Sequence, residues 1–147
     1  MHRRMWFYAL LLSTLALLVA GCGAADGASE AGQTPLGYAK NGDGYADISV
    51  EQLAELLEAE DVTMVNVHVP YEGELPQTDL FIPYDEIQDH LAELPAKDAP
   101  IVLYCRSGSM STTAARVLAE EGYSNVMELD GGFNAWEASG QQLLMSR

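Results

Sequence analysis

An alternation of short apolar segments with amphipathic segments constrains the fold of this chain more than any other feature. Residues 62–69 are rich in β-branched side chains and stop at Pro70, so they are predicted to form a buried strand. Residues 101–104 are a brief apolar run of the kind found in the centre of a sheet, and residues 126–129 are predicted to form another short strand. The chain therefore has several strands that must be covered by other elements.

Helical patterns separate these strands. Ser49 and Gln52 form a capping box in front of leucines at helical spacing. Further helices are predicted at residues 83–94, 112–121 and 133–139, each bounded by Pro or Gly. Strands that alternate with helices predict an open, mainly parallel α/β sheet. Ligands of such sheets lie beyond the carboxyl ends of the strands.

The first residues indicate the compartment. Arg3 and Arg4 precede an almost wholly apolar run at residues 6–20. This run is shorter than the ~20 residues that a bilayer span requires and has the length of a signal peptide. It ends in a small residue followed directly by Cys22, which resembles the bacterial lipoprotein box. We expect residues 1–21 to be removed.

In proteins with such a box, the cysteine is lipidated and becomes the new N-terminus. We therefore expect Cys22 to anchor the protein at the extracytoplasmic face of the cell membrane. The alternatives are an ordinary secretory signal with a chance cysteine, or a retained membrane helix.

The remainder of the chain divides into a tether and one domain. Residues 22–45 are rich in Gly, Ala, Asp and Ser and predict a flexible tether. Residues 46–147 are long enough for one domain. The chain carries 22 acidic and 7 basic side chains, a formal net charge of −15. Such a surface repels phosphate backbones, so a nucleic-acid partner is not expected.

Two cysteines are present, Cys22 and Cys105. If the first carries lipid, the second is a lone free thiol in a compartment where thiols are easily oxidised. Cys105 follows a predicted strand and precedes a Ser/Gly loop and a helix. Loop amides and the helix N-terminus favour a thiolate there, which predicts a nucleophile that carries an anionic intermediate. The alternative is a small buried hydrophobic residue.

Three segments together resemble the rhodanese (sulfurtransferase) family. Residues 105–111 are similar to its active-site loop, Cys-x-x-Gly-x-Arg-Ser. Residues 129–136, followed by Gly140, match its closing signature, Leu-x-Gly-Gly-x-x-x-Trp-x-x-x-Gly. Residues 65–72 parallel its Asp-Val-Arg-x-x-x-Glu segment. The resemblance covers about residues 46–142.

The resemblance implies a five-stranded parallel sheet flanked by helices. It also implies that Cys105 takes a sulfane sulfur from a small anionic or persulfide donor, such as thiosulfate, and passes it to a thiol or to cyanide. The six-residue loop, 105–110, favours sulfur chemistry over the longer loops of related phosphatase and arsenate-reductase domains. The resemblance assigns donor binding to the loop residues Arg106, Ser107, Gly108, Ser109, Met110 and Ser111.

The chain also departs from the family. Met110 replaces the loop arginine, Asn66 and His68 replace an acid and a base, and Glu74 replaces a histidine. We therefore expect a Cys105 persulfide enzyme or sulfur carrier that uses thiosulfate poorly. The alternatives are a catalytically weak binding module for an anion or a partner protein, and a phosphatase-like or arsenate-reducing activity. His68 is expected to be structural or on the surface. The residue spacings predict neither a metal site nor a cofactor.

Overall fold

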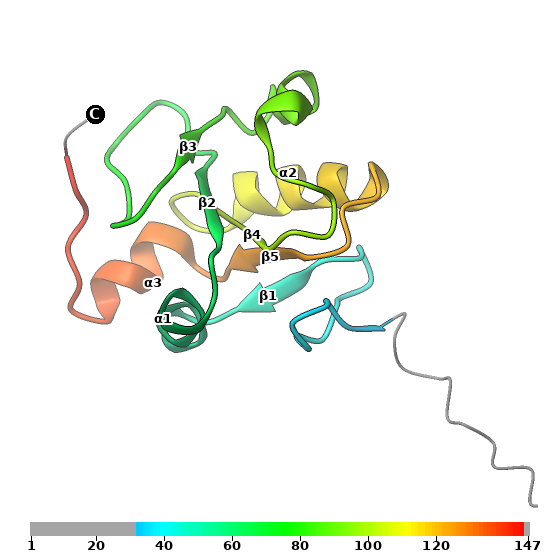
Figure 1. Cartoon of the computed structure of the whole chain (residues 1–147). Coiled ribbons are helices and arrows are strands. Elements are labelled where there is room, and N and C mark those ends of the chain that lie inside the picture. Colours follow the sequence, from blue (N-terminus) through cyan, green and yellow to red (C-terminus); the bar gives the residue numbers. More distant parts are fainter. Residues whose placement is uncertain (1–31, 146–147) are drawn as a thin grey trace, which may run out of the picture.

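The computed structural model describes residues 32–145. The expected signal peptide and Cys22 lie outside these residues. The described chain contains a five-stranded sheet in the order β1-β5-β4-β2-β3, and every pair of neighbouring strands is parallel (Figure 1). This confirms the predicted open parallel sheet. The strands are β1 (Ala46–Ile48), β2 (Thr63–Asn66), β3 (Leu80–Phe81), β4 (Ile101–Tyr104) and β5 (Val126–Leu129).

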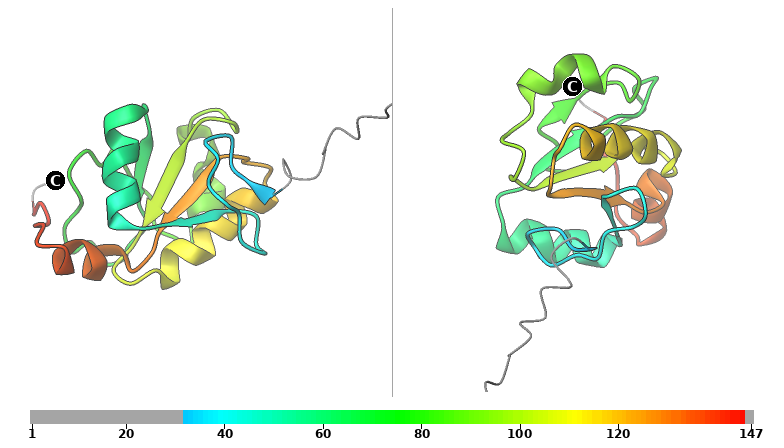
Figure 2. Two further views of the ribbon diagram at one scale, coloured as in Figure 1. Left: turned by 90° about the horizontal axis from the view of Figure 1, so that it is seen from below. Right: turned by 90° about the vertical axis from the view of Figure 1, so that its right-hand side faces the viewer.

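Helices cover both faces of the sheet, which makes three layers (Figure 2). Successive strand residues point to opposite faces, so each strand contributes to two separate apolar clusters. One cluster packs under α2 and η2, and the other packs under α1 and α3. The helical elements are α1 (Val50–Ala59), the 3₁₀ helix η2 (Ile87–Glu93), α2 (Ser109–Glu120) and α3 (Gly132–Ala138).

Local sequence signals placed several elements correctly. Strands β4 and β5 begin and end at the predicted residues. The capping box at α1 is present, because Ser49 Oγ accepts a hydrogen bond from the amide of Gln52 and Gln52 Oε1 accepts one from the amide of Ser49. Strand β2 is shorter than predicted, because the amide of His68 donates to the side chain of Asn66 at 3.0 Å instead of to a neighbouring strand.

The predicted helix at residues 83–94 is a short 3₁₀ helix with a kink at His90. The regular helix is interrupted at His90, whose φ of −109° and ψ of 16° are not helical. The amide of Leu94 bonds to the carbonyl of Leu91, the i→i+3 pattern of a 3₁₀ turn.

Residues 32–45 differ from the expected flexible tether, because they fold against the domain. Tyr45 is buried in the cluster under α2, and Leu36 and Tyr38 pack against the cluster on the other face. These large apolar side chains explain why this part of the segment is ordered. Within residues 32–145, every helix is too short or too polar to cross a membrane.

Candidate active site

Cys105 lies directly after β4, at the carboxyl edge of the sheet, where the sequence placed it. Its side chain is buried, with 1% of the residue exposed. The amide of Gly108 donates to its sulfur at 3.2 Å, and the hydroxyl of Ser111 lies within hydrogen-bond distance of the same sulfur, at 3.3 Å. Gly108 adopts φ +99° at the start of α2, a conformation suited to glycine that turns its amide toward the sulfur. The sulfur therefore lies where the loop and the start of α2 offer hydrogen-bond donors.

The first turn of α3 holds the loop from the other side. The amide of Phe133 donates to the carbonyl of Cys105 at 2.9 Å, and the amide of Asn134 donates to that of Arg106 at 3.0 Å. A Cβ atom on Gly132 would lie 2.0 Å from the carbonyl oxygen of Cys105. The second glycine of the Gly-Gly pair therefore permits the backbone contact that positions Cys105.

Glu128 completes the surroundings of the sulfur, and sequence reasoning missed it. It lies on β5 and is 2% exposed, and its Oε1 accepts a hydrogen bond of 2.5 Å from Ser111 Oγ. Burial, helped by the charges of Asp47 and Asp130, raises the pKa of Glu128 to about 7, against the opposing effect of the Ser111 hydrogen bond. The available signal was a single acid inside an otherwise apolar strand.

A second group of charged side chains lies beside the loop. Glu72 Oε2 accepts a hydrogen bond from His68 Nε2 at 2.6 Å and also pairs with Arg106. The hydrogen bond from His68, with the charge of Arg106, holds the pKa of Glu72 below its ordinary value. His68 is buried and packs edge-on against Phe133, with ring centroids 5.5 Å apart. His68 therefore supports the acid that engages Arg106.

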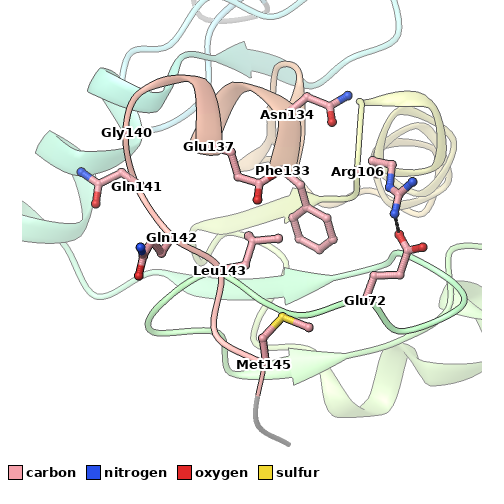
Figure 3. Close-up of a pocket in the computed structure, with 10 residues that line it drawn as sticks. All are labelled: Glu72, Arg106, Phe133, Asn134, Glu137, Gly140, Gln141, Gln142, Leu143 and Met145. Carbon is pink, nitrogen blue, oxygen red and sulfur yellow. Dashed lines mark hydrogen bonds and ion pairs between the residues drawn. The ribbon is translucent and has the colours of Figure 1, made fainter.

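A cavity of about 830 Å³ opens next to this group, between α3 and the C-terminal segment (Figure 3). The Arg106–Glu72 pair lies at one end of it, and Gln141 and Gln142 lie at the other. Its lining residues are Glu72, Arg106, Phe133, Asn134, Glu137, Gly140, Gln141, Gln142, Leu143 and Met145. The lining thus combines one guanidinium with two carboxylates and several apolar side chains. Cys105 is not among the residues that line this cavity.

The predicted donor-binding residues occupy different positions. Gly108 and Ser111 contact the sulfur, and Arg106 lines the cavity. Ser107 and Ser109 are exposed on the loop. Met110 is half-buried and packs against the apolar cluster under α2. Between residues 32 and 145, no three His, Cys, Asp or Glu side chains are arranged to hold a metal ion.

Comparison with known proteins extends this picture. Residues 49–139 match the rhodanese-like domain family. A protein named sulfurtransferase from Allochromatium vinosum is 38% identical over 98 residues, which are 64% of this chain and 90% of that protein. A thiosulfate sulfurtransferase GlpE from Pseudoalteromonas translucida is 36% identical over 98 residues, 65% of this chain and 91% of its own length.

A solved structure shows the same fold. The crystal structure of a rhodanese-related protein from Thermoplasma volcanium superimposes with a TM-score of 0.60 at 24% identity, covering 69% of this chain and all of that chain. The parallel sheet, the cysteine loop at its carboxyl edge and the match over residues 49–139 agree with one another. The chain therefore belongs to the rhodanese-like domain family.

Proposed function

We propose that the protein is a sulfurtransferase or sulfane-sulfur carrier that works through a persulfide on Cys105. The observation that carries this proposal is the hydrogen bond from the amide of Gly108 to the Cys105 sulfur, with the hydroxyl of Ser111 placed 3.3 Å from the same atom. Relatives named sulfurtransferase and thiosulfate sulfurtransferase, at 38% and 36% identity, support it.

The transfer takes two steps. The Cys105 thiolate attacks the sulfane sulfur of the donor, a new S–S bond forms, and the bond from that sulfur to the rest of the donor breaks. The donor remnant leaves with the electron pair. A thiolate acceptor, or cyanide, then attacks the outer sulfur of the persulfide, and the Cys105 thiolate is released.

The donor is less charged or bulkier than thiosulfate. Cys105 does not line the cavity beside its loop, so we place only the remainder of the donor there, where Glu72 and Glu137 outnumber Arg106. The partner of Arg106 is one of those acids. Met110 supplies no charge where the family loop has an arginine, and a thioether cannot make the charge-assisted hydrogen bonds that a sulfonate group accepts. The apolar side chains of Phe133 and other lining residues suit a carbon-containing donor.

We further propose that the domain works at the extracytoplasmic face of the cell membrane, attached through lipid on Cys22. The short apolar run at residues 6–20 and the cysteine directly after it support this proposal. A domain placed there would meet donors and acceptors outside the cytoplasm.

A binding module for an anion or a partner protein is the second candidate function. The observation that favours it is the burial of Cys105, of which 1% is exposed. A nucleophile has to meet its donor, whereas a binding module requires only the surface around the loop.

The experiment that separates the two functions measures cyanide-labile sulfur on the purified protein after incubation with thiosulfate and with organic persulfides. We expect one labile sulfur per chain on the wild type and none on Cys105→Ser, with the free energy of unfolding of the variant close to that of the wild type. A wild type that acquires no labile sulfur from any donor would support the binding module. Labile sulfur on Cys105→Ser would contradict the assignment of the nucleophile.

A further inference from the structure

Glu128 is a buried acid for which the transfer steps give no role. Strand β5 presents it to the face of the sheet under α2, where Ser111 meets it at 2.5 Å. The same hydroxyl lies 3.3 Å from the sulfur of Cys105 and 3.0 Å from the carbonyl oxygen of Gly108. Ser111 therefore connects a carboxyl group to the nucleophile.

The hydroxyl of Ser111 has one hydrogen to donate, and the protonation of its neighbours decides where that hydrogen goes. If Glu128 is protonated, its O–H donates to Ser111 Oγ, and the serine hydrogen is free to donate to a Cys105 thiolate. If Glu128 is ionised, the serine hydrogen goes to the carboxylate, and Ser111 Oγ can accept a hydrogen bond from a Cys105 thiol. The two states differ only in the place of one proton.

We propose that Glu128 is a positioning residue that shares one proton with Cys105 through the Ser111 hydroxyl, so that the thiolate forms together with the neutral carboxyl. In this exchange Ser111 passes its hydrogen to one neighbour and receives one from the other, so no proton is lost. The inference rests on the proposed function, since it names the group that prepares its nucleophile.

The surroundings favour this pairing of states. Asp47 lies opposite Glu128 in the β1–β5 ladder, and Asp130 follows β5, so the charged groups near Glu128 on its own and the neighbouring strand are negative. On the side of α2, Glu128 contacts the hydroxyl of Ser111. Through this hydroxyl it faces the sulfur of Cys105, which follows β4. A carboxylate and a thiolate in such a buried site would repel each other, so one of them holds a proton. The raised pKa of Glu128 agrees with this arrangement.

The pH dependence of Cys105 alkylation by iodoacetamide tests the proposal, because this neutral reagent reports the thiolate without any sulfur transfer. In Glu128→Gln the side chain stays uncharged at every pH and its N–H can donate to Ser111 Oγ, which imitates the neutral acid. We expect its alkylation midpoint to lie ~1 pH unit below that of the wild type, about a tenfold faster reaction at pH values below both midpoints. Glu58→Gln removes the same charge from an exposed position on α1 and should leave the profile unchanged.

Two further variants separate a shared proton from simple repulsion. In Ser111→Ala the connection is absent, so adding Glu128→Gln should shift the midpoint much less than it does in the wild type. Ser111→Thr retains the hydroxyl and should restore most of the shift. Equal shifts in the wild-type and Ser111→Ala backgrounds, or a Glu128→Gln profile identical to that of Glu58→Gln, would overturn the proposal.

Infrared difference spectra provide a measurement on the unaltered site, which does not depend on how well the Ser111 variants fold. Alkylation of Cys105 in the wild type should change the carboxyl bands of one acid, and that change should be missing in Glu128→Gln. Its presence in both proteins would overturn the proposal. If the proton is shared but no donor yields a persulfide, the proposed function fails and this inference about the thiol does not.

Discussion

Gly132 approaches Cys105 so closely that a Cβ atom on the glycine would lie 2.0 Å from the cysteine carbonyl oxygen. The approach lets the next amide in α3, that of Phe133, donate to the same oxygen. The backbone after β4 is therefore positioned by a helix that begins 27 residues later in the chain. A loop held in this way should be sensitive to the smallest substitution at Gly132.

Gly132→Ala should lower the free energy of unfolding by at least ~2 kcal/mol, because alanine adds a backbone clash to the strain of φ +50°. Urea unfolding measures the loss. Gly140→Ala is the matched control, since Gly140 also has positive φ, +85°, but has no atom within 4 Å of the added Cβ. We expect it to cost ~1 kcal/mol. Equal losses at the two glycines would show that the contact with Cys105 does not constrain the fold.

Met110→Arg should raise kcat/KM for thiosulfate ten- to a hundredfold. At ~4 Å and an effective dielectric of ~20, a charge pair has a raw attraction of ~4 kcal/mol. Desolvation cancels part of this attraction, and each ~1.4 kcal/mol that remains raises kcat/KM tenfold. Met110→Gln removes the same thioether packing without adding charge and serves as the control. Steady-state rates with thiosulfate and with a neutral persulfide provide the comparison. Brisk wild-type turnover of thiosulfate, unchanged in Met110→Arg, would contradict this account of the loop.

The stability of the wild type should fall as the pH rises from about 4.5 to about 7. The folded protein raises the pKa of Glu128 from 4.5 to about 7, so it binds a proton that the unfolded chain releases at lower pH. The resulting stabilisation is complete when the pH is below the pKa of Glu128 in the unfolded chain. It is lost as the pH rises through the pKa of Glu128 in the folded protein, and its upper limit is about 3 kcal/mol. Glu128→Gln should show a flatter profile between these pH values. Chemical unfolding of both proteins at a series of pH values checks this, and parallel profiles would contradict it.

The attachment of Cys22 can be tested on the native protein. Mass spectrometry should find an N-terminal, lipidated Cys22, and the protein should sediment with membranes, because two acyl chains anchor stably where one binds only marginally. Cys22→Ser should shift the protein out of the membrane fraction. Recovery of intact Met1, or of a cleaved chain without lipid, would rule out the anchor.

Much of the scaffold follows from local sequence. Four apolar residues at 101–104, and three apolar residues around Glu128 at 126–129, are enough to indicate buried strands, because a largely apolar strand must be covered on both faces. The capping box at Ser49 starts a helix through bonds that span three residues. The place of Cys105, at the end of a strand and before a helix, follows from the same local signals. Short-range order of this kind depends on neighbours in the chain and is visible without the fold.

The chemical surroundings of Cys105 were decided by the tertiary structure. Glu128 meets Ser111 from 17 positions away, and Glu72 meets Arg106 from 34 positions away, because parallel strands bring distant carboxyl ends to one edge of the sheet. Sequence spacing cannot say which side chains meet at that edge, since this depends on strand order and register. The sequence by itself determined that a cysteine would be presented at this edge. The packing of β5 and α2 determined that a buried acid would be connected to its sulfur.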